Sequence, residues 1–514
     1  MSRARFFAIL LLTCALVTLA SSVAVFADPD GTKTGTAQDV IGATSGAPTA
    51  DDLKAAGESE PFAAKLADVV GQNKVAINFT WTLVAGFLVM FMQAGFALVE
   101  TGFTRAKNAT HTMFMNFAVY ALGIIGFYIC GFALMYGNAG PIGNLGGTPA
   151  LAGGHEFYIT LAGKKMGLFG TQGFFLTGNY YDVAAAALFL FQMVFMDTAV
   201  TIPTGALAER WRLKSFLVYG FFMSMFLYPL FGNWAWGGGW LAKLGENFGL
   251  GSGYMDFAGS GVVHSIGGLC GLAGAMVLGP RIGKYNRDGS ANAIPGHHIP
   301  MAILGTLILA FGWFGFNPGS TLGASGGNNL RFAMVATNTM LASAFGLATA
   351  VIYMVMKFGK PDPSMACNGM LAGLVAITAP CGFVNCVDSC IIGAIAGVLV
   401  CLSVSFWDKV HVDDPVGAVS VHGACGLFGV LSVGLWADGS FNDVTGLLHG
   451  GGFGQLGAQL IGMVTLVIWA FGVSYVFWKV LDKIIPMRSP KEEELVGLDL
   501  PETGALAYPE FELK

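Results

Sequence analysis

Long apolar runs recur after Lys74, each close to the length that a helix needs to cross a bilayer core of about 30 Å. Eleven such runs can be recognised between short polar breaks, near residues 77–99, 112–136, 183–205, 213–233, 256–279, 299–317, 331–356, 366–381, 387–408, 416–436 and 454–483. Backbone N–H and C=O groups in lipid must find partners within their own segment. The runs therefore predict an all-α polytopic membrane protein with eleven transmembrane helices.

The composition agrees with a membrane protein and excludes other classes. Only 11% of the residues are charged, against about 25% in soluble domains. The net charge of −5 leaves no basic field for nucleic acid. The nine cysteines form no CxxC pair and no Cys/His zinc spacing, so no metal or cofactor is expected. Cys381, Cys386 and Cys390 lie close together in the sequence; buried packing is the default for them, and a disulfide is the alternative.

The two ends of the chain have a different character from the apolar core. Arg3 and Arg5 precede an apolar run, and small residues near position 27 fit a cleavage site. Residues 1–27 are therefore predicted to be a signal peptide, with an extra membrane helix as the alternative. We expect residues 28–74 to form an extracytoplasmic linker, residues 75–486 the transmembrane domain and residues 487–514 a cytoplasmic tail.

Positive charge is confined almost entirely to alternate loops, which sets the expected orientation. One set of loops and the tail carry the lysines and arginines, among them Arg105, Lys107, Arg210, Arg212, Lys214, Arg281, Lys284, Arg287, Lys357, Lys360 and Lys409. Such loops face the cytoplasm. The pattern predicts a multi-pass protein of the inner (plasma) membrane, with its N-terminus outside and its C-terminus in the cytoplasm.

Two histidines lie deep in apolar runs at related positions. His264 follows Asp256 by eight residues, and His422 follows Asp414 by the same distance. Laying spans 1–5 over spans 6–10 matches these segments and predicts inverted five-helix repeats, with a site between the halves at mid-membrane. An ionisable group at that depth is costly and usually faces a cavity or a partner, although a purely packing histidine is the alternative. Two neutral imidazoles can share a proton and still offer an acceptor to a passing N–H group.

Aromatic residues lie near the predicted outer mouth. Phe191 and Phe195 are four residues apart and share one helix face, and Trp236 lies in a tryptophan- and glycine-rich break. Such rings can hold a cation, although an aromatic belt at the membrane surface is the alternative. Asp256 is expected to cap the fifth span and to add negative potential, without touching the solute.

Several long motifs, in order, resemble the ammonium transporter family, the Amt/Mep/Rh proteins, from about Phe79 to Tyr508. They are Met90-Phe91-Met92-Gln93-Ala94-Gly95-Phe96-Ala97-Leu98-Val99-Glu100, Gly205-Ala206-Leu207-Ala208-Glu209-Arg210, Asp256-Phe257-Ala258-Gly259, Gly312-Trp313-Phe314-Gly315-Phe316-Asn317-Pro318-Gly319-Ser320, Val412-Asp413-Asp414-Pro415 and Gly497-Leu498-Asp499.

The resemblance implies a role for each candidate residue. His264 and His422 would be the twin pore histidines. Phe191, Phe195, Trp236 and Ser320 would form the outer ammonium site, and Phe195 with Phe316 would gate the pore below it. Trp236 and Ser320 favour the Amt branch. The family further implies a homotrimer in membrane lipid, with one pore per subunit, and contact with a cytoplasmic PII-type regulatory protein. The tail departs from the family pattern at Thr503-Gly504, where a His-Gly pair is common, which weakens that last expectation.

The predicted function is ammonium transport rather than enzymatic catalysis. Ammonium or methylammonium would be recruited at the outer mouth as a cation and would pass the histidines as the neutral amine, with a proton relay left open. A Rh-like gas channel and an ammonium sensor acting through the tail are the alternatives. An intramembrane hydrolase is disfavoured because no serine or aspartate constellation accompanies either histidine. The chain ends soon after Tyr508, which argues against a fused sensor kinase.

Overall fold

The computed structural model describes residues 28, 34–41, 47–137, 143–147, 155–326 and 329–511. The predicted signal peptide, residues 1–27, lies outside this part of the chain.

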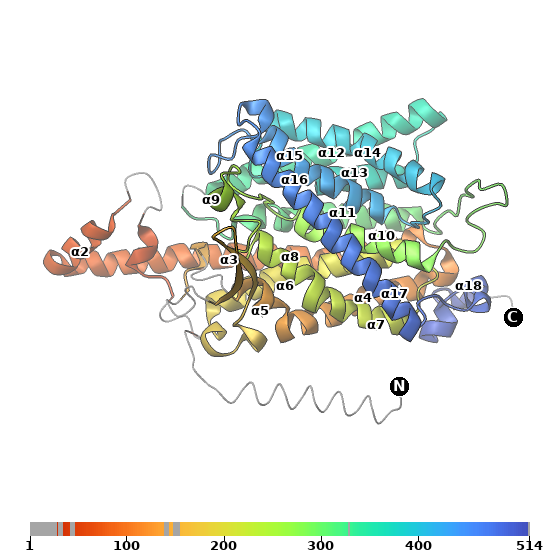
Figure 1. Ribbon diagram of the computed structural model, residues 1–514, viewed down its shortest axis with the longest axis horizontal. Helices are drawn as coiled ribbons and strands as arrows, with labels where there is room; N and C mark the ends of the chain where they lie inside the picture. The colour runs from red at the N-terminus through yellow and green to blue at the C-terminus, as the bar shows by residue number, and fades with distance from the viewer. Residues whose placement is uncertain are drawn as a thin grey trace, which may run out of the picture.

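A bundle of long apolar helices forms most of the molecule (Figure 1). In chain order the spans are α3 (Pro61–Phe103), α4 and α5 (Ala109–Gly126, Phe132–Tyr136), α6 (Val183–Ala206), α7 and α8 (Leu213–Phe222, Tyr228–Ala235), η9 and α10 (Ser260–Ser265, Ile266–Leu278), α11 (Ile299–Phe316), α12 (Phe332–Phe358), α13 (Pro363–Ile377), α14 (Cys386–Lys409), η12 and α15 (Val419–Ala424, Cys425–Trp436), and α16 and α17 (Gly454–Leu466, Ser474–Ile484). Short π-helical segments join the paired helices of three spans: η3 (Phe127–Gly131), η8 (Met223–Leu227) and η14 (Val467–Val473).

The observed helices match the predicted architecture. Within the described residues, ten helices are long and apolar enough to cross a membrane. The eleventh predicted span is α13, which has 15 residues and ends in a turn at residues 378–383 rather than continuing as a helix. The protein is thus a multi-pass helical membrane protein, and the part of the chain that the structure describes adds one small β-hairpin to the helices.

That hairpin lies in the longest loop and was not predicted. Strands β1 (Glu156–Leu161) and β2 (Lys164–Gly170) pair antiparallel through a turn at Ala162 and Gly163. Both turn residues have positive φ, 50° and 75°, which suits a tight two-residue hairpin turn. We call the end of the bundle that carries this hairpin and α9 (Leu244–Phe248) the hairpin end.

The segment predicted as a linker, residues 28–74, is largely helical where it is described. Helix α2 (Ala50–Ser59) begins at a capping box formed by Thr49 and Asp52, and α3 begins at Pro61. Helix α3 therefore extends well before its first membrane-crossing residues and projects with α2 beyond the bundle (Figure 1). The expectation of a loose linker is wrong over this range because a capped, alanine-rich sequence favours helix.

The opposite end of the bundle carries the C-terminal helix α18 (Lys491–Val496), and we call it the tail end. Buried ion pairs hold its loops together: Arg281 pairs with Asp413 at 2.8 Å and with Glu209 at 3.3 Å. Burial acts to raise the pKa of Asp413, but Arg210 and Arg281 outweigh it and hold that pKa below its ordinary value. The tail is fastened to the same loops, because Glu494 accepts a hydrogen bond from the Ile282 N–H and pairs with Arg488.

The expectation of buried packing holds for one of the three neighbouring cysteines, Cys381, whereas Cys386 and Cys390 are partly exposed. Among the described residues, Cys381, Cys386 and Cys390 are free thiols, and Cys381 is buried.

Candidate transport site

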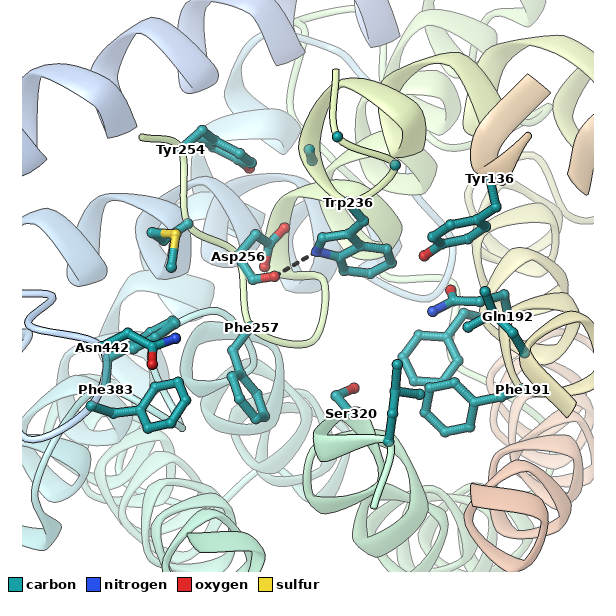
Figure 2. A pocket seen from close by; sticks show the side chains of 18 of the residues that line it. Tyr136, Phe191, Gln192, Trp236, Tyr254, Asp256, Phe257, Ser320, Phe383 and Asn442 are labelled. Carbon is teal, nitrogen blue, oxygen red and sulfur yellow. Dashed lines mark hydrogen bonds between the residues drawn. The ribbon is translucent and has the colours of Figure 1, made fainter. Parts of the chain in front are cut away.

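A cavity of about 620 Å³ opens into the hairpin end of the bundle. Its lining brings together all four residues assigned to the outer site: Phe191, Phe195, Trp236 and Ser320. Figure 2 shows Phe191 and Gln192 on one wall, Phe257 and Phe383 on the facing wall, and Ser320 between them. We call this cavity the vestibule.

Trp236 is fixed at the edge of the vestibule by a hydrogen bond. Its indole Nε1–H donates to the backbone carbonyl oxygen of Asp256 at 2.7 Å (Figure 2). The indole also lies edge-on to Phe195, with ring centroids 6.4 Å apart. Because its only N–H group is already engaged, Trp236 offers the vestibule its ring rather than a donor.

Two stacked rings close the floor of the vestibule. The Phe195 and Phe316 centroids are 4.1 Å apart with the planes 27° from parallel, and both side chains are buried. They come from α6 and from the end of α11, so helices distant in sequence meet at this point. A fully hydrated cation cannot pass two rings in van der Waals contact without their movement.

The two histidines lie directly beyond this ring pair. The Nδ1 atoms of His264 and His422 are 3.1 Å apart, and both side chains are buried. The His264 ring also stacks on Phe316 at 5.3 Å, so the stacked ring pair and the histidines form one continuous series. One Nδ1 must donate and the other accept, so the two neutral rings adopt opposite tautomers. The Nε2 atom of His264 is buried with no hydrogen-bond partner among the described residues.

The backbone around each histidine has the same unusual form. His264 lies in the π-helical segment η9 and His422 in the π-helical segment η12. A π-helical turn inserts a residue into the helix and is often found at functional sites. The two segments occupy corresponding spans of the two halves, in agreement with the predicted inverted repeat.

The carboxylate eight residues before each histidine caps the helix that carries it. Asp256 accepts hydrogen bonds from the N–H groups of Gly259, Gly261 and Val262 at 2.9 Å. Asp414 accepts equivalent bonds from residues 417, 418 and 419 at 2.7–3.1 Å. Each Asp thereby satisfies N–H groups that a helix start leaves without partners.

A glycine lets the two histidine-bearing helices meet. A Cβ atom at Gly268 would overlap the backbone of Gly423, the residue after His422. The stretch from Gly267 to Gly271 therefore packs inside the protomer.

A second, much smaller cavity of about 20 Å³ lies on the tail side of the histidines. It is lined by His422, Phe96, Asn368 and Glu100, among others. A space of this volume holds about one water-sized molecule. Glu100, which was not singled out from the sequence, lines the same cavity as His422. Its carboxylate accepts hydrogen bonds from Asn116 and Thr204.

The structure thus brings the predicted aromatic and histidine residues together in one series. Sequence reasoning missed three contributors: Glu100, Trp313, which stacks on His264 at 5.3 Å, and Arg331 in the vestibule. Glu100 and Trp313 lie within motifs that carry the family resemblance, but the sequence does not show that their side chains face the histidines. Arg331 lies at the start of a span, where an arginine is ordinary and gives no signal.

Comparison with known proteins agrees with this geometry. The model of the Ammonium Transporter Family matches residues 80–508. The chain is 44% identical over 455 residues to the ammonium transporter Amt2 of Archaeoglobus fulgidus, covering 87% of this chain and 91% of the relative. It is 36% identical over 441 residues to a putative ammonium transporter of Synechocystis, covering 85% and 90% respectively.

Solved structures give the same result. A structure titled Sensor Amt Protein is 37% identical with a TM-score of 0.72, over 84% of this chain and 99% of that chain. The Mep2 protein of Candida albicans is 27% identical with a TM-score of 0.70, over 85% and 93%. A family model that spans most of the chain, relatives above 30% identity and a shared fold lead to one conclusion: this chain belongs to the ammonium transporter family.

Proposed function

We propose that this protein transports ammonium across the membrane, recruiting the cation at the hairpin end and passing it as ammonia toward the tail end. The observation that carries the proposal is the unbroken series from the vestibule through the stacked rings to the 3.1 Å histidine pair and the small cavity beyond. Relatives named ammonium transporters support the choice of substrate.

Recruitment uses rings and a hydroxyl. Ammonium is a small cation that the faces of Trp236 and Phe191 attract by about 0.5–2 kcal/mol each, depending on how dry the site is. Ser320 donates its hydroxyl hydrogen to the Phe316 carbonyl oxygen at 2.8 Å, which leaves the lone pairs of its oxygen for an ammonium N–H. Asp256, fully engaged by backbone N–H groups, contributes potential rather than contact.

The passage beyond the rings favours the neutral amine. The stacked rings of Phe195 and Phe316 offer no charge to replace the water that a cation would lose, and burying an unpaired ion is very costly. Ammonia keeps its hydrogen-bonding ability without that charge. The histidine whose Nδ1 donates has an unprotonated Nε2, which accepts a hydrogen bond from the amine. When that Nε2 instead takes the proton that ammonium gives up, the Nδ1 proton moves to the Nδ1 of the second histidine, and the Nε2 of the second histidine releases its own proton.

The assembly and orientation follow the family and the charge pattern. We place the tail end in the cytoplasm, because the ion pairs of Arg105, Arg281, Lys284 and Arg488 gather there. We further propose a homotrimer in the inner membrane and a cytoplasmic partner of the PII type at the tail. Native mass spectrometry of the solubilised protein that finds only monomers would contradict the trimer.

Uptake of labelled methylammonium into proteoliposomes tests the function directly. Transport predicts saturable uptake that ammonium inhibits, and liposomes without protein provide the control. A sensor that binds ammonium and reports through the tail predicts binding without uptake, and that result would overturn the proposal.

A further inference from the structure

Arg331 lies in the vestibule on a cradle of aromatic rings. Its guanidinium carbon is 3.0 Å from the centre of the Phe441 ring and 4.7 Å from the centre of the Phe257 ring. Phe383 supports both rings, at centroid distances of 5.8 Å and 6.0 Å. Such packing holds the guanidinium plane in a fixed place by cation–π attraction.

Two of the N–H-bearing nitrogen atoms of the Arg331 guanidinium have no acceptor to bond to among the described residues. Its Nε and Nη1 atoms are buried, and neither has a hydrogen-bond partner in the part of the chain that the structure describes. No described carboxylate lies within ion-pair distance of it either. Leaving buried donors of a charged group unsatisfied costs more than a hydrogen bond usually gains, so this arrangement requires an acceptor from elsewhere.

The other charges of the vestibule do not supply that acceptor. Three charged side chains line the cavity: Lys243, Asp256 and Arg331. Lys243 pairs with Glu246 at 2.7 Å, and the Asp256 carboxylate is occupied by three backbone N–H groups. Of the three, Arg331 alone has neither a counter-charge nor hydrogen-bond partners for its buried Nε and Nη1 among the described residues, and it stands in the cavity that we assign to cation recruitment.

We infer that the vestibule binds a small monovalent anion, of the class of chloride, at Arg331. A single guanidinium offers one positive charge, and its apolar ring walls disfavour a strongly hydrated polyanion. An anion there neutralises the charge that otherwise opposes ammonium in the same cavity. Because linkage is reciprocal, bound anion raises the affinity for ammonium, and ammonium raises the affinity for the anion. This inference rests on the proposed ammonium site.

The route of this coupling is short. Phe257, which touches Arg331, follows Asp256 directly in the chain, and the Asp256 carbonyl oxygen holds the Trp236 indole. The two ions would thus be bound in the same vestibule, at places that the consecutive residues Asp256 and Phe257 connect. Bound ammonium and the bound anion would therefore attract each other electrostatically without a conformational change of the protein.

The test measures ammonium-evoked currents in proteoliposomes at constant ionic strength, with chloride replaced stepwise by lactobionate, which is too bulky for a slot between rings. The wild type should need about 3- to 10-fold more ammonium for half-maximal current without chloride, a coupling of ordinary size. Arg331→Gln should show no chloride dependence. Lys243→Gln removes a charge from the same cavity that is already paired, and it should keep the dependence of the wild type.

A direct binding measurement on the wild type tests the inference even where Arg331→Gln folds poorly. Crystals of the wild type grown in bromide should show an anomalous peak at the guanidinium, and Arg331→Lys, which keeps the charge, should retain a weaker one. Equal chloride dependence in the wild type and Arg331→Gln, an ammonium response independent of chloride in the wild type, or no bromide at Arg331 would each overturn the inference. Absence of any ammonium current in the wild type would instead count against the transport function.

Discussion

The Nδ1 atoms of His264 and His422 lie 3.1 Å apart although 158 residues separate them in the chain. Each comes from a π-helical segment, and each segment is preceded by a capping aspartate at the same spacing. The two halves of the protein thus contribute one half-site each. Positioning therefore depends on how closely the two helices approach.

Gly268 sets that approach, and replacing it should separate the histidines. In Gly268→Ala the added methyl group would overlap the Gly423 backbone, so the helices must move apart. We expect loss of most methylammonium uptake together with a loss of stability of about 1–3 kcal/mol, typical of overpacking. Gly472→Ala is the matched control because its Cβ would meet no atom within 4 Å. Equal uptake by both variants would contradict this role of Gly268.

Phe316 closes the passage, and its removal should admit other cations. In Phe316→Ala the ring stacked 4.1 Å from Phe195 is lost, which leaves a path wide enough for water. We expect potassium-evoked current that the wild type lacks, and destabilisation of about 3–5 kcal/mol for a buried aromatic ring. Phe311 lies on the same helix with 55% of its surface exposed, so Phe311→Ala should change neither property. Continued potassium exclusion by folded Phe316→Ala would argue against a gate.

The outer-site and histidine residues were accessible to sequence reasoning because polar groups inside apolar runs are rare and costly. His264 and His422 are examples, and the matching distance from each to its aspartate predicted the repeat. The role of Arg331 could not be predicted from the sequence, because what sets this residue apart is that its guanidinium has no hydrogen-bond or ion-pair partner among the described residues. That property depends on the fold of the loops around Phe257 and Phe441, which no periodicity encodes.

The hairpin at residues 156–170 and the helices within residues 28–74 were not predicted, although each has signals in its own sequence. The aromatic and β-branched residues of 156–161 and the Ala162-Gly163 turn are strand signals, but they lie in a loop between predicted membrane helices. In the linker, Pro61 is a good first residue of a helix. Helix α3 therefore continues from water into the membrane without a break.

Asp414 should make the stability of the protein fall as pH rises from about 4 to about 6. Burial raises the pKa of Asp414 to about 6 in the folded protein, despite the N–H groups that it caps. The folded state then binds more protons than the unfolded state in that window, so the contribution present at low pH is lost as pH rises through 6. In Asp414→Asn the free energy of unfolding should fall less between low and neutral pH, by an amount on the order of 2 kcal/mol. Unfolding temperatures of both proteins in detergent at pH 4.5 and 7 give the measurement, and identical slopes would contradict it.

Glu494 should hold the tail to the bundle. Its side chain is 1% exposed, accepts from the Ile282 N–H and pairs with Arg488. In Glu494→Ala these donors lose their acceptor, and we expect local destabilisation of roughly 1–3 kcal/mol. Limited trypsin digestion should then cut faster at Lys491, whereas Glu492→Ala, at an exposed position, should behave as the wild type. Equal cleavage rates in both variants would show that the tail is held by other contacts.

The histidine pair carries the central claim, and currents test it most directly. We would record ammonium- and potassium-evoked currents in proteoliposomes for the wild type, His264→Ala and His264→Glu. Because ammonium and potassium ions are similar in size, selectivity must reside in groups that accept ammonium hydrogens and its proton. We therefore expect His264→Ala to lose the ammonium current, and His264→Glu, whose carboxylate attracts whole cations, to admit potassium. Equal ammonium currents and unchanged potassium exclusion in all three proteins would contradict the account and leave the histidines as packing residues.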